Sequence, residues 1–121
     1  MDYARDIDVY VTTAKRKRDQ EKDELILREE RAWETARRAA ILLKEQFGVS
    51  RVVVFGSLVH KGCFTRWSDV DIAAWGISPE DTFYAMSTVM DVATDVEVNL
   101  VDVGVCHPAL LAVIEREGIE L

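Results

Sequence analysis

Two short polar motifs flank a loop in the middle of the chain, and their residue types could bind a phosphate together with a metal ion. The first is Gly56-Ser57, directly after the apolar residues 52–55. Glycine lets the backbone turn tightly and bring its N–H groups close to an anion, and the serine hydroxyl adds a donor. The second is the pair Asp69 and Asp71, whose carboxylates project from one face of a strand because they are two residues apart. The motifs therefore predict a phosphate-binding turn beside paired carboxylates.

The paired carboxylates are typical ligands of Mg²⁺. This ion accepts few protein oxygens and completes its coordination shell with water and with phosphate oxygens of a substrate. A nucleoside triphosphate held at the Gly-Ser turn would supply those oxygens. The sequence lacks the Gly-Lys-Ser/Thr of a Walker-type P-loop, so that class of nucleotide site is excluded.

In their order and context, the motifs resemble the signature of the nucleotidyltransferases related to DNA polymerase beta, which is Gly-Ser, a short spacer and Asp-x-Asp on the next strand. Gly56-Ser57 matches the first part, and Ser-Asp-Val-Asp from Ser68 to Asp71 matches the second. Either motif alone is common, but the two together between apolar runs are specific. The resemblance implies a Mg²⁺-dependent nucleotidyltransferase in which Gly56 and Ser57 bind the phosphates and Asp69 and Asp71 bind the metal.

The expected third strand departs from the family pattern. The resembling family usually carries a third acidic residue there, and the matching position in this chain is Asn99. An asparagine amide can ligate a metal but cannot take the proton of the attacking hydroxyl as a general base. Glu97 lies two residues earlier on the same strand face, a displacement of about 7 Å. Two alternatives follow: Glu97 supplies the missing carboxylate, or catalysis has been lost.

The loop of residues 58–67 carries further candidates for nucleotide binding. A triphosphate bound at the turn would pass this loop, so Lys61 and Arg66 could contact its phosphates, with ordinary solvation as the alternative. His60 is a weaker candidate, because the corresponding family position commonly holds Arg or another polar group. Ser68 completes the set of nucleotide-binding candidates, and we expect it to cap or orient the strand that carries Asp69.

Length and composition indicate one soluble domain. The 121 residues allow a single domain, and an apolar content of 49% supports a real core. No apolar stretch approaches the roughly 20 residues of a membrane span, and the N-terminus lacks the pattern of a signal peptide. Cys63 and Cys106 are too few and too unpatterned for a disulfide framework or a zinc site. We expect a cytoplasmic protein with no membrane partner.

Negative charge is concentrated in the second part of the chain. Residues 1–47 hold 11 basic and 11 acidic side chains, whereas residues 48–121 hold 4 and 11, so the whole net charge of −7 lies there. Such an acidic surface repels polyanions. We therefore expect no broad binding of DNA or RNA, and a need for divalent metal to bring in a triphosphate.

The N-terminal third of the chain should be helical. Residues 1–47 contain neither glycine nor proline and are rich in strong helix formers, which predicts one long helix or two that end at Gly48. From about residue 25 onward, apolar residues recur mostly at steps of three and four and should pack on a sheet. These are Leu25, Ala32, Ala36, Ala39, Ala40, Leu43 and Phe47.

Toward the N-terminus this apolar face becomes patchy. Residues 12–24 are almost wholly polar, with the basic residues 15–18 followed by acids. One interpretation is a solvated helix that projects or frays. The other is a docking arm for another subunit or protein, and its candidate anchors near the free end are Tyr3, Ile7, Tyr10 and Val11.

A second helix is expected from about Pro79 to Val92. Ser78 can cap it, proline is favoured at the first helical position, and acidic residues suit the first turn. The residues that share one face of this helix should pack in the core and should not form a ligand-binding site. They are Phe83, Met86, Val89 and Met90.

A third strand and a last helix complete the chain. Alternation of apolar and polar residues predicts a strand over residues 96–101. Asp102 follows on the opposite face from Asn99 and should be solvated or capping. The last helix runs from Ala109 to Glu117, with His107 as a helix-start residue.

The expected fold class is α/β, a small mixed β-sheet covered by helices, which is the polymerase beta-like nucleotidyltransferase fold with a long N-terminal helix. At least three strands are expected, over residues 51–55, 70–75 and 96–101. We divide the chain into a long helical segment, residues 1–47, and a minimal nucleotidyltransferase core, residues 48–121. The family's larger members append domains that bind the base and the acceptor, and this chain has no room for them.

The resemblance to minimal nucleotidyltransferases also implies a partner. In prokaryotes such proteins are commonly paired with a helical HEPN protein, as antitoxins that transfer AMP from ATP onto a tyrosine of the toxin. One alternative is a catalytically impaired binding module that masks a partner through the long helix. Another is an enzyme that modifies a small molecule, in which a homodimer could restore the missing acceptor pocket.

Overall fold

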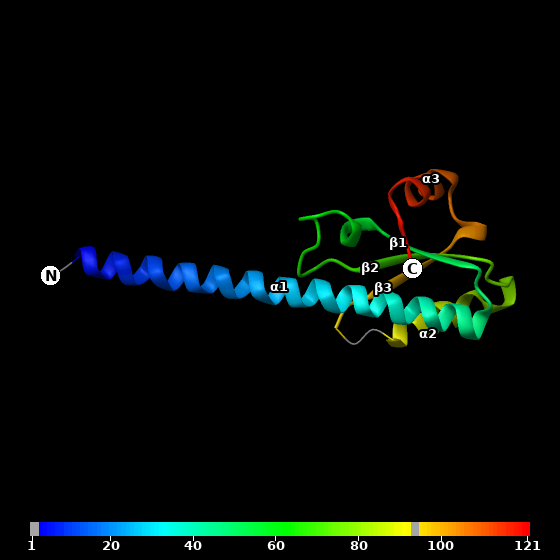
Figure 1. Ribbon diagram of the computed structural model, residues 1–121, viewed down its shortest axis with the longest axis horizontal. Helices are drawn as coiled ribbons and strands as arrows, with labels where there is room; N and C mark the ends of the chain where they lie inside the picture. Colours follow the sequence, from blue (N-terminus) through cyan, green and yellow to red (C-terminus); the bar gives the residue numbers. More distant parts are fainter. Residues whose placement is uncertain (1–2, 93–94) are drawn as a thin grey trace.

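The computed structural model describes residues 3–92 and 95–121 and shows an α/β domain from which one long helix projects (Figure 1). Its centre is a mixed sheet with the strand order β3-β2-β1-β4. β1 pairs antiparallel with β2 and β4, whereas β2 and β3 are parallel. The strands are β1 Arg51–Phe55, β2 Val70–Trp75, β3 Val98–Asp102 and β4 Ile119–Glu120. The expected small mixed sheet covered by helices is confirmed.

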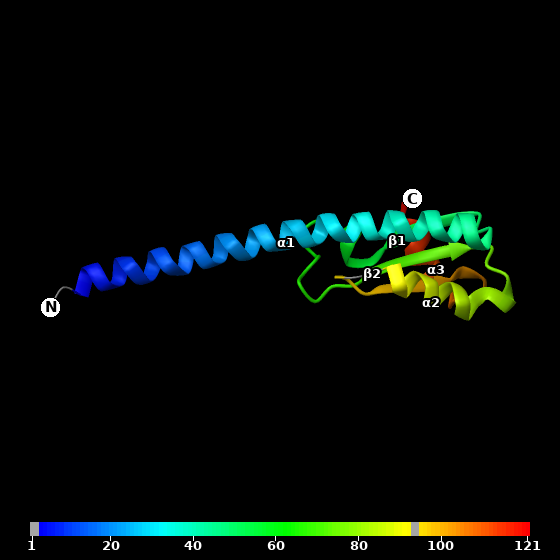
Figure 2. The same ribbon diagram turned by 90° about the horizontal axis from the view of Figure 1, so that it is seen from below.

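Helices cover both faces of the sheet. α1 (Tyr3–Phe47) and α2 (Thr82–Val92) pack on one face, and α3 (Pro108–Glu117) packs on the other (Figures 1 and 2). Because side chains alternate along a strand, β1 supplies Val52 and Val54 to the first layer and Val53 to the second. The central strands are therefore buried on both sides, which explains their apolar runs over residues 52–55 and 72–75.

Two of the three predicted strands have the expected bounds. The third begins at Val98 instead of residue 96, because its parallel pairing with β2 starts where β2 starts, at Val70 opposite Val98. β4 was not predicted, because its two residues form no pattern that could mark a strand. It is held by backbone pairing with Val53 and Val54 of β1.

α1 is one continuous helix of 45 residues. Its predicted apolar face packs on the sheet from Leu25 onward, and Ala32, Ala36 and Ala39 are fully buried there. Small side chains let the helix backbone approach the sheet closely. From residue 4 to residue 24 every side chain is exposed except the half-buried Ala14, so this segment projects about 30 Å as a single helix (Figure 2). The side chain of Tyr3, one of the candidate anchors, lies outside the described part.

The packing face of α2 differs from the prediction. Phe83 is 86% exposed and Met90 is 56% exposed, so neither belongs to the core. The helix packs instead through the buried Ala85 and Val89, with Met86 against the same cluster. Ala85 is apolar but small, and the sequence pattern gave more weight to the larger Phe83, which points away from the sheet. The predicted start at Pro79 is a 3₁₀ turn, Pro79–Asp81, that leads into the helix.

Asp102 and His107 both cap short helical segments. Asp102 accepts hydrogen bonds from the Gly104 N–H at 3.0 Å and from the Thr82 hydroxyl at 3.1 Å. It is buried, so the capping role that the sequence indicated is confirmed and the solvated alternative is wrong. The Nδ1 of His107 accepts from the N–H of Ala109 at 3.0 Å, which confirms it as the helix-start residue of α3.

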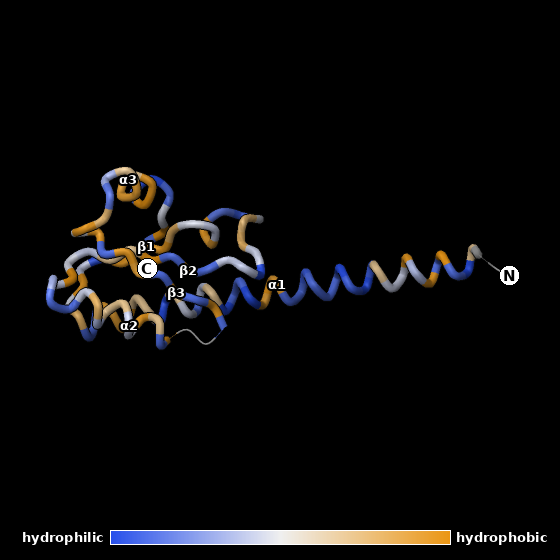
Figure 3. The backbone as a smooth tube through the Cα atoms, turned by 180° about the vertical axis from the view of Figure 1, so that it is seen from behind, coloured by the Kyte–Doolittle hydropathy of each residue, from blue (hydrophilic) through white to orange (hydrophobic). Residues whose placement is uncertain are grey.

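Hydropathy along the backbone follows this architecture. The strands and the short helices are mostly hydrophobic, the middle of the projecting segment is hydrophilic, and hydrophobic residues return toward its free end (Figure 3). Across residues 3–92 and 95–121, none of the helices combines the length and the apolar character needed to cross a membrane.

The alanine face of α1 generates a testable expectation. Ala36→Leu should lower the free energy of unfolding by about 1–3 kcal/mol, because the side chain at 36 is fully buried and a larger one must push the helix off the sheet. Urea denaturation measures the change. The exposed Glu45 of the same helix is the control, and Glu45→Leu should stay within about 0.5 kcal/mol of the wild type. Equal effects of the two substitutions would contradict close packing at residue 36.

Candidate active site

The two predicted motifs meet at one end of the sheet. Asp71 lies on the central strand β2, opposite Phe55 of β1 on one side and Asn99 of β3 on the other. Gly56 follows Phe55 directly and starts the 3₁₀ turn Gly56–Val59. The strand register alone therefore brings the turn, the second aspartate and the asparagine side by side.

Gly56 approaches the carboxylate of Asp71 more closely than any other residue type could. Its φ is +80°, a conformation that glycine adopts readily and L-residues rarely do. A Cβ atom at this position would lie 2.6 Å from Oδ2 of Asp71, well inside van der Waals contact. The next residue, Ser57, is half-buried, and Leu58 is buried in the core and holds the turn in place.

Asn99 connects the two aspartates. Its Nδ2 donates to Oδ1 of Asp71 at 3.2 Å and to Oδ2 of Asp69 at 3.4 Å. The two carboxylates therefore converge on one point, as their spacing predicted. A half-turn of the amide would present its oxygen to that point instead of its nitrogen, so the same three side chains form an oxygen donor set of the kind that hard divalent cations take.

The pKa of the Asp71 carboxyl is raised above its usual value. The main cause is burial, which disfavours the charged form, and the nearby Asp69 carboxylate acts in the same direction. The hydrogen bond from Asn99 opposes both by stabilising the ionised form. A positive charge between the carboxylates would stabilise the ionised form of Asp71 and so oppose both causes that raise its pKa.

Glu97 is not brought into this cluster. It lies one residue before β3 and is exposed, and its backbone carbonyl accepts the N–H of Val70 at 2.8 Å. Throughout the described residues, no three side chains of His, Cys, Asp or Glu gather as a metal site. The group beside Asp69 and Asp71 is thus completed by Asn99 and not by a third acid.

The basic side chains of the loop, which were candidates for contacts with phosphate, are exposed and contact other residues or solvent. The guanidinium of Arg66 lies 4.1 Å from the ring centroid of Trp67, and Lys61 is exposed. His60 contacts Glu117 of α3 at 3.3 Å. The Ser68 hydroxyl accepts the N–H of Thr65 at 2.8 Å, so it closes the turn that leads into Asp69.

Arg28 of α1 is the site-positioning residue that sequence reasoning missed. Its Nη1 donates to the carbonyl of Asp95 at 3.0 Å, and its Nη2 donates to the carbonyl of Ser68 at 3.2 Å. The guanidinium also lies over the ring of Phe64, 6.0 Å from its centroid. Through these bonds, one side chain of α1 holds the segment that leads into β2 and the segment that leads into β3. The available signal was an arginine at helical spacing within the apolar face, between Leu25 and Ala32.

Known proteins with this fold are found among solved structures. No protein-family model and no curated protein matches the sequence. A chain of a mutant MntA-HpeT toxin-antitoxin crystal structure has a TM-score of 0.57 at 19% identity, over 70% of this chain and 70% of that chain. A chain of a toxin-antitoxin crystal structure with AMP-PNP has a TM-score of 0.57 at 24% identity, over 69% of each.

A third structure contains a tri-AMPylated Shewanella oneidensis HEPN toxin in complex with MNT antitoxin. One of its chains has a TM-score of 0.55 at 18% identity, over 74% of this chain and 70% of that chain. At these identities the likeness establishes the fold. The chain has the small nucleotidyltransferase fold that its two motifs predicted.

The close approach of Gly56 to Asp71 gives a sharp substitution test. Gly62 has nearly the same positive φ, +81°, but a Cβ there meets open space. Gly62→Ala should therefore cost about 1–2 kcal/mol of stability from backbone strain alone. Gly56→Ala should cost about 1–3 kcal/mol more, because it also displaces the carboxylate. Thermal and urea unfolding measure both variants, and equal losses would show that the Asp71 carboxylate does not depend on the glycine.

The raised pKa of Asp71 predicts a pH-dependent stability in metal-free buffer. A carboxyl with a raised pKa in the folded state favours folding while protonated, and this contribution is lost as the pH rises through the folded-state pKa. Asp71→Asn should therefore be more stable than the wild type near neutral pH, and the difference should shrink as the pH falls below about 4. Melting temperatures from pH 3 to 8 in a chelator measure it. The exposed Asp91→Asn is the control, and the same pH trend there would contradict a specific effect.

Proposed function

We propose that this protein is a Mg²⁺-dependent nucleotidyltransferase that transfers AMP from ATP to a hydroxyl of a partner protein, as the antitoxin of a HEPN-type toxin. The supporting observation is the convergence of Asp69 and Asp71 beside the Gly56 turn, on a fold shared with chains of toxin-antitoxin structures. One of the similar structures contains a tri-AMPylated toxin, and another contains the nucleotide analogue AMP-PNP.

The donor set fits a divalent cation. Two carboxylates converge on one point, and burial together with their mutual repulsion makes ionisation of Asp71 costly without a positive charge. Asp69 and Asp71 would hold Mg²⁺, with Asn99 as a further oxygen ligand. The ion would neutralise charge on the α-phosphate and the leaving pyrophosphate.

The residues of the turn and the loop bind the nucleotide in this proposal. The backbone at Gly56 and the hydroxyl of Ser57 hold the phosphates. Lys61 and Arg66 are exposed on the loop and would compensate the negative charge of the triphosphate. Ser68 acts indirectly, because its hydrogen bond with Thr65 fixes the turn that carries Asp69.

The acceptor hydroxyl attacks the α-phosphorus, the bond from that phosphorus to the bridging oxygen of the β-phosphate breaks, and pyrophosphate leaves. The hydroxyl proton must pass to a base, and the amide of Asn99 cannot accept it. Asn99 therefore orients the two aspartates, and Glu97, two residues before it, remains the candidate base. Because Glu97 is exposed, proton transfer would require its side chain to turn toward the site when the acceptor binds.

A binding module without catalysis is the second candidate function. Asn99 favours it, because the amide stabilises both carboxylates through hydrogen bonds and no acid takes the third position. In that case the chain would bind the nucleotide and the partner, and would mask the partner without modifying it.

Intact mass spectrometry of the protein encoded by the adjacent gene tests transfer. Incubation with this chain, ATP and Mg²⁺ should add the mass of one or more AMP groups to that protein. The Asp69→Asn/Asp71→Asn double variant should add none, because it lacks both proposed cation ligands. A complex that forms without any gain in mass would refute the transferase and favour the binding module.

Substitutions of Glu97 and Asn99 separate the transferase from the binding module further. If Glu97 is the base, Glu97→Gln should lower the transfer rate by about 10²–10⁴-fold, which is the usual contribution of a general base. Asn99→Asp would then change the rate little. A large gain on Asn99→Asp, with no effect of Glu97→Gln, would instead show that the asparagine limits a vestigial activity.

A further inference from the structure

α2 presents a row of side chains to solvent, and the large members of this row are apolar. Phe83, Ser87 and Met90 follow one another at steps of four and three, on the side of the helix away from the buried Ala85 and Val89. Phe83 is 86% exposed and Met90 is 56% exposed. Neighbouring apolar side chains that a folded domain leaves this exposed are typical of interaction sites.

The row ends at a cavity of about 310 Å³. Phe83 and Pro79 line the cavity from the start of α2 and from the turn before it, and Val105 lines it from the 3₁₀ turn Val103–Val105. Val105 is exposed, whereas Ile77, which also lines the cavity, belongs to the buried core. The cavity therefore provides a mostly apolar recess beside the ring of Phe83.

The charges around this apolar row have one sign. The sequence holds no lysine or arginine between Arg66 and Arg116. Glu80 precedes the row and is exposed, Asp91 follows it and is exposed, and Asp81 is half-buried. The surface of α2 is therefore apolar in its middle and acidic at both ends.

The basic residues of the neighbouring helix do not cancel these acids. Of the elements packed against α2, α1 carries basic side chains, and these have acceptors of their own. Arg31 pairs with Asp95 at 3.7 Å, and Arg38 pairs with Glu34 at 3.5 Å. Lys44 donates to the last backbone carbonyl of the chain at 2.8 Å. The acids at the two ends of the row thus keep their excess of negative charge.

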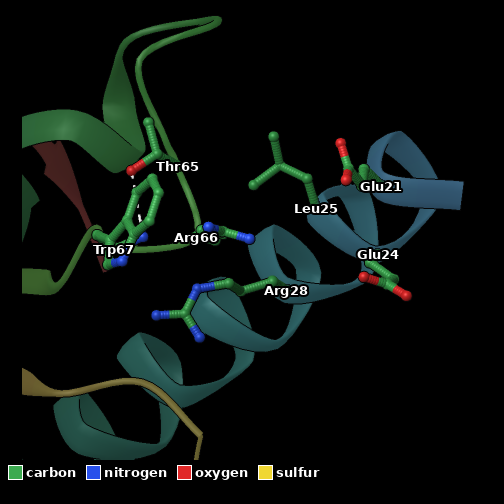
Figure 4. Close-up of a pocket in the computed structure, with 7 residues that line it drawn as sticks. All are labelled: Glu21, Glu24, Leu25, Arg28, Thr65, Arg66 and Trp67. Atoms are coloured by element: carbon green, nitrogen blue, oxygen red, sulfur yellow. Dashed lines mark hydrogen bonds between the residues drawn. The ribbon is translucent and has the colours of Figure 1, made fainter. Parts of the chain in front are cut away.

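A larger cavity gives no such signal. It lies between α1 and the loop of residues 58–67 and has a volume of about 500 Å³ (Figure 4). Its lining combines Glu21 and Glu24 with Arg28 and Arg66, so charges of both signs are present. That cavity selects no partner by charge, whereas the surface of α2 does.

The α2 surface consists of Phe83, Met90, Val105, Glu80 and Asp91. We propose that it is the docking site of a partner protein whose own contact surface is basic around a protruding apolar side chain. That side chain would enter the cavity beside Phe83, and lysines or arginines of the partner would lie against the acids. The proposal goes beyond AMP transfer, because the cavity lies past the end of β2 that is remote from the site carboxylates.

A second copy of this chain fits the α2 surface less well. Two such surfaces placed face to face would bring acids against acids. The projecting segment of another copy would bring its acidic residues 19, 21, 23 and 24 together with its basic residues 15–18. Nucleic acids are disfavoured because their phosphates would meet carboxylates.

A peptide probe tests the surface without nucleotide. The probe is a labelled amphipathic helix of leucine and lysine, and a matched peptide carries glutamate in place of each lysine. The wild type should prefer the lysine peptide by about tenfold or more, and Phe83→Ser should weaken its binding by about tenfold. Ile41→Ser is the control, because Ile41 is an apolar side chain of α1 that is 57% exposed outside the α2 surface. Fluorescence anisotropy measures the affinities, and circular dichroism checks that the variants fold alike.

Two charge reversals test the acidic part of the surface. Asp91→Lys and Glu30→Lys change the net charge equally, but Glu30 is exposed on α1 outside the α2 surface. Asp91→Lys should weaken binding of the lysine peptide by about threefold or more, and Glu30→Lys should have a smaller effect. Equal effects would show attraction by net charge alone and would overturn the docking site.

The remaining outcomes also decide the proposal. Equal affinity of Phe83→Ser and the wild type, or no preference for the lysine peptide, would overturn it. A wild-type dimer that Phe83→Ser dissociates in sedimentation would assign the surface to a second copy and overturn it as well. Because the peptide assay contains no ATP, its failure leaves AMP transfer standing. Absence of transfer in the mass measurement would likewise leave the α2 surface standing.

Discussion

The contact between the backbone of Gly56 and the carboxylate of Asp71 is the constraint on which the rest of the site depends. A Cβ atom at residue 56 would overlap the carboxylate where it now lies, so the turn after β1 can approach Asp71 this closely only through glycine. The antiparallel register of β1 with β2 sets the contact, because Phe55 stands opposite Asp71. The parallel register of β2 with β3 then adds Asn99 from the other side. The pairing of the strands, rather than any loop, therefore determines the distances among the Gly56 backbone, the Asp71 carboxylate and the Asn99 amide.

Arg28 links this sheet geometry to the long helix. Its two hydrogen bonds end on carbonyls that lie just before Asp69 and shortly before β3, so a shift of α1 would be transmitted to both strands. The guanidinium is partly buried, and within the described part of the chain its Nε has no hydrogen-bond partner, which is a cost that the two carbonyl bonds must offset. The same helix continues into the projecting segment.

The sequence predicted the parts of the site that depend on local pattern. The apolar runs before Gly56 and after Asp69 marked two central strands, and the glycine and the aspartate spacing indicated which ends of them meet. Tertiary packing decided what was missed. β4 exists only through backbone pairing with β1, and α2 turned Phe83 outward because the smaller Ala85 fits against the sheet. Arg28 was overlooked because its partners are backbone carbonyls distant in sequence, which no side-chain motif marks.

The asparagine at position 99 changes the electrostatics of the site and not only its chemistry. With a carboxylate there, three negative charges would converge, and the arrangement would hold together only around a cation. The amide instead donates to both aspartates and opposes the rise in the pKa of Asp71. The two carboxylates therefore converge without an ion, and the proposed cation would require only that the amide turn its oxygen inward. Under the proposed function, such a site would be assembled before a nucleotide binds, and the base for the acceptor proton would come from outside the cluster. In the proposed function the exposed Glu97, one residue before β3, is the nearest candidate for that base.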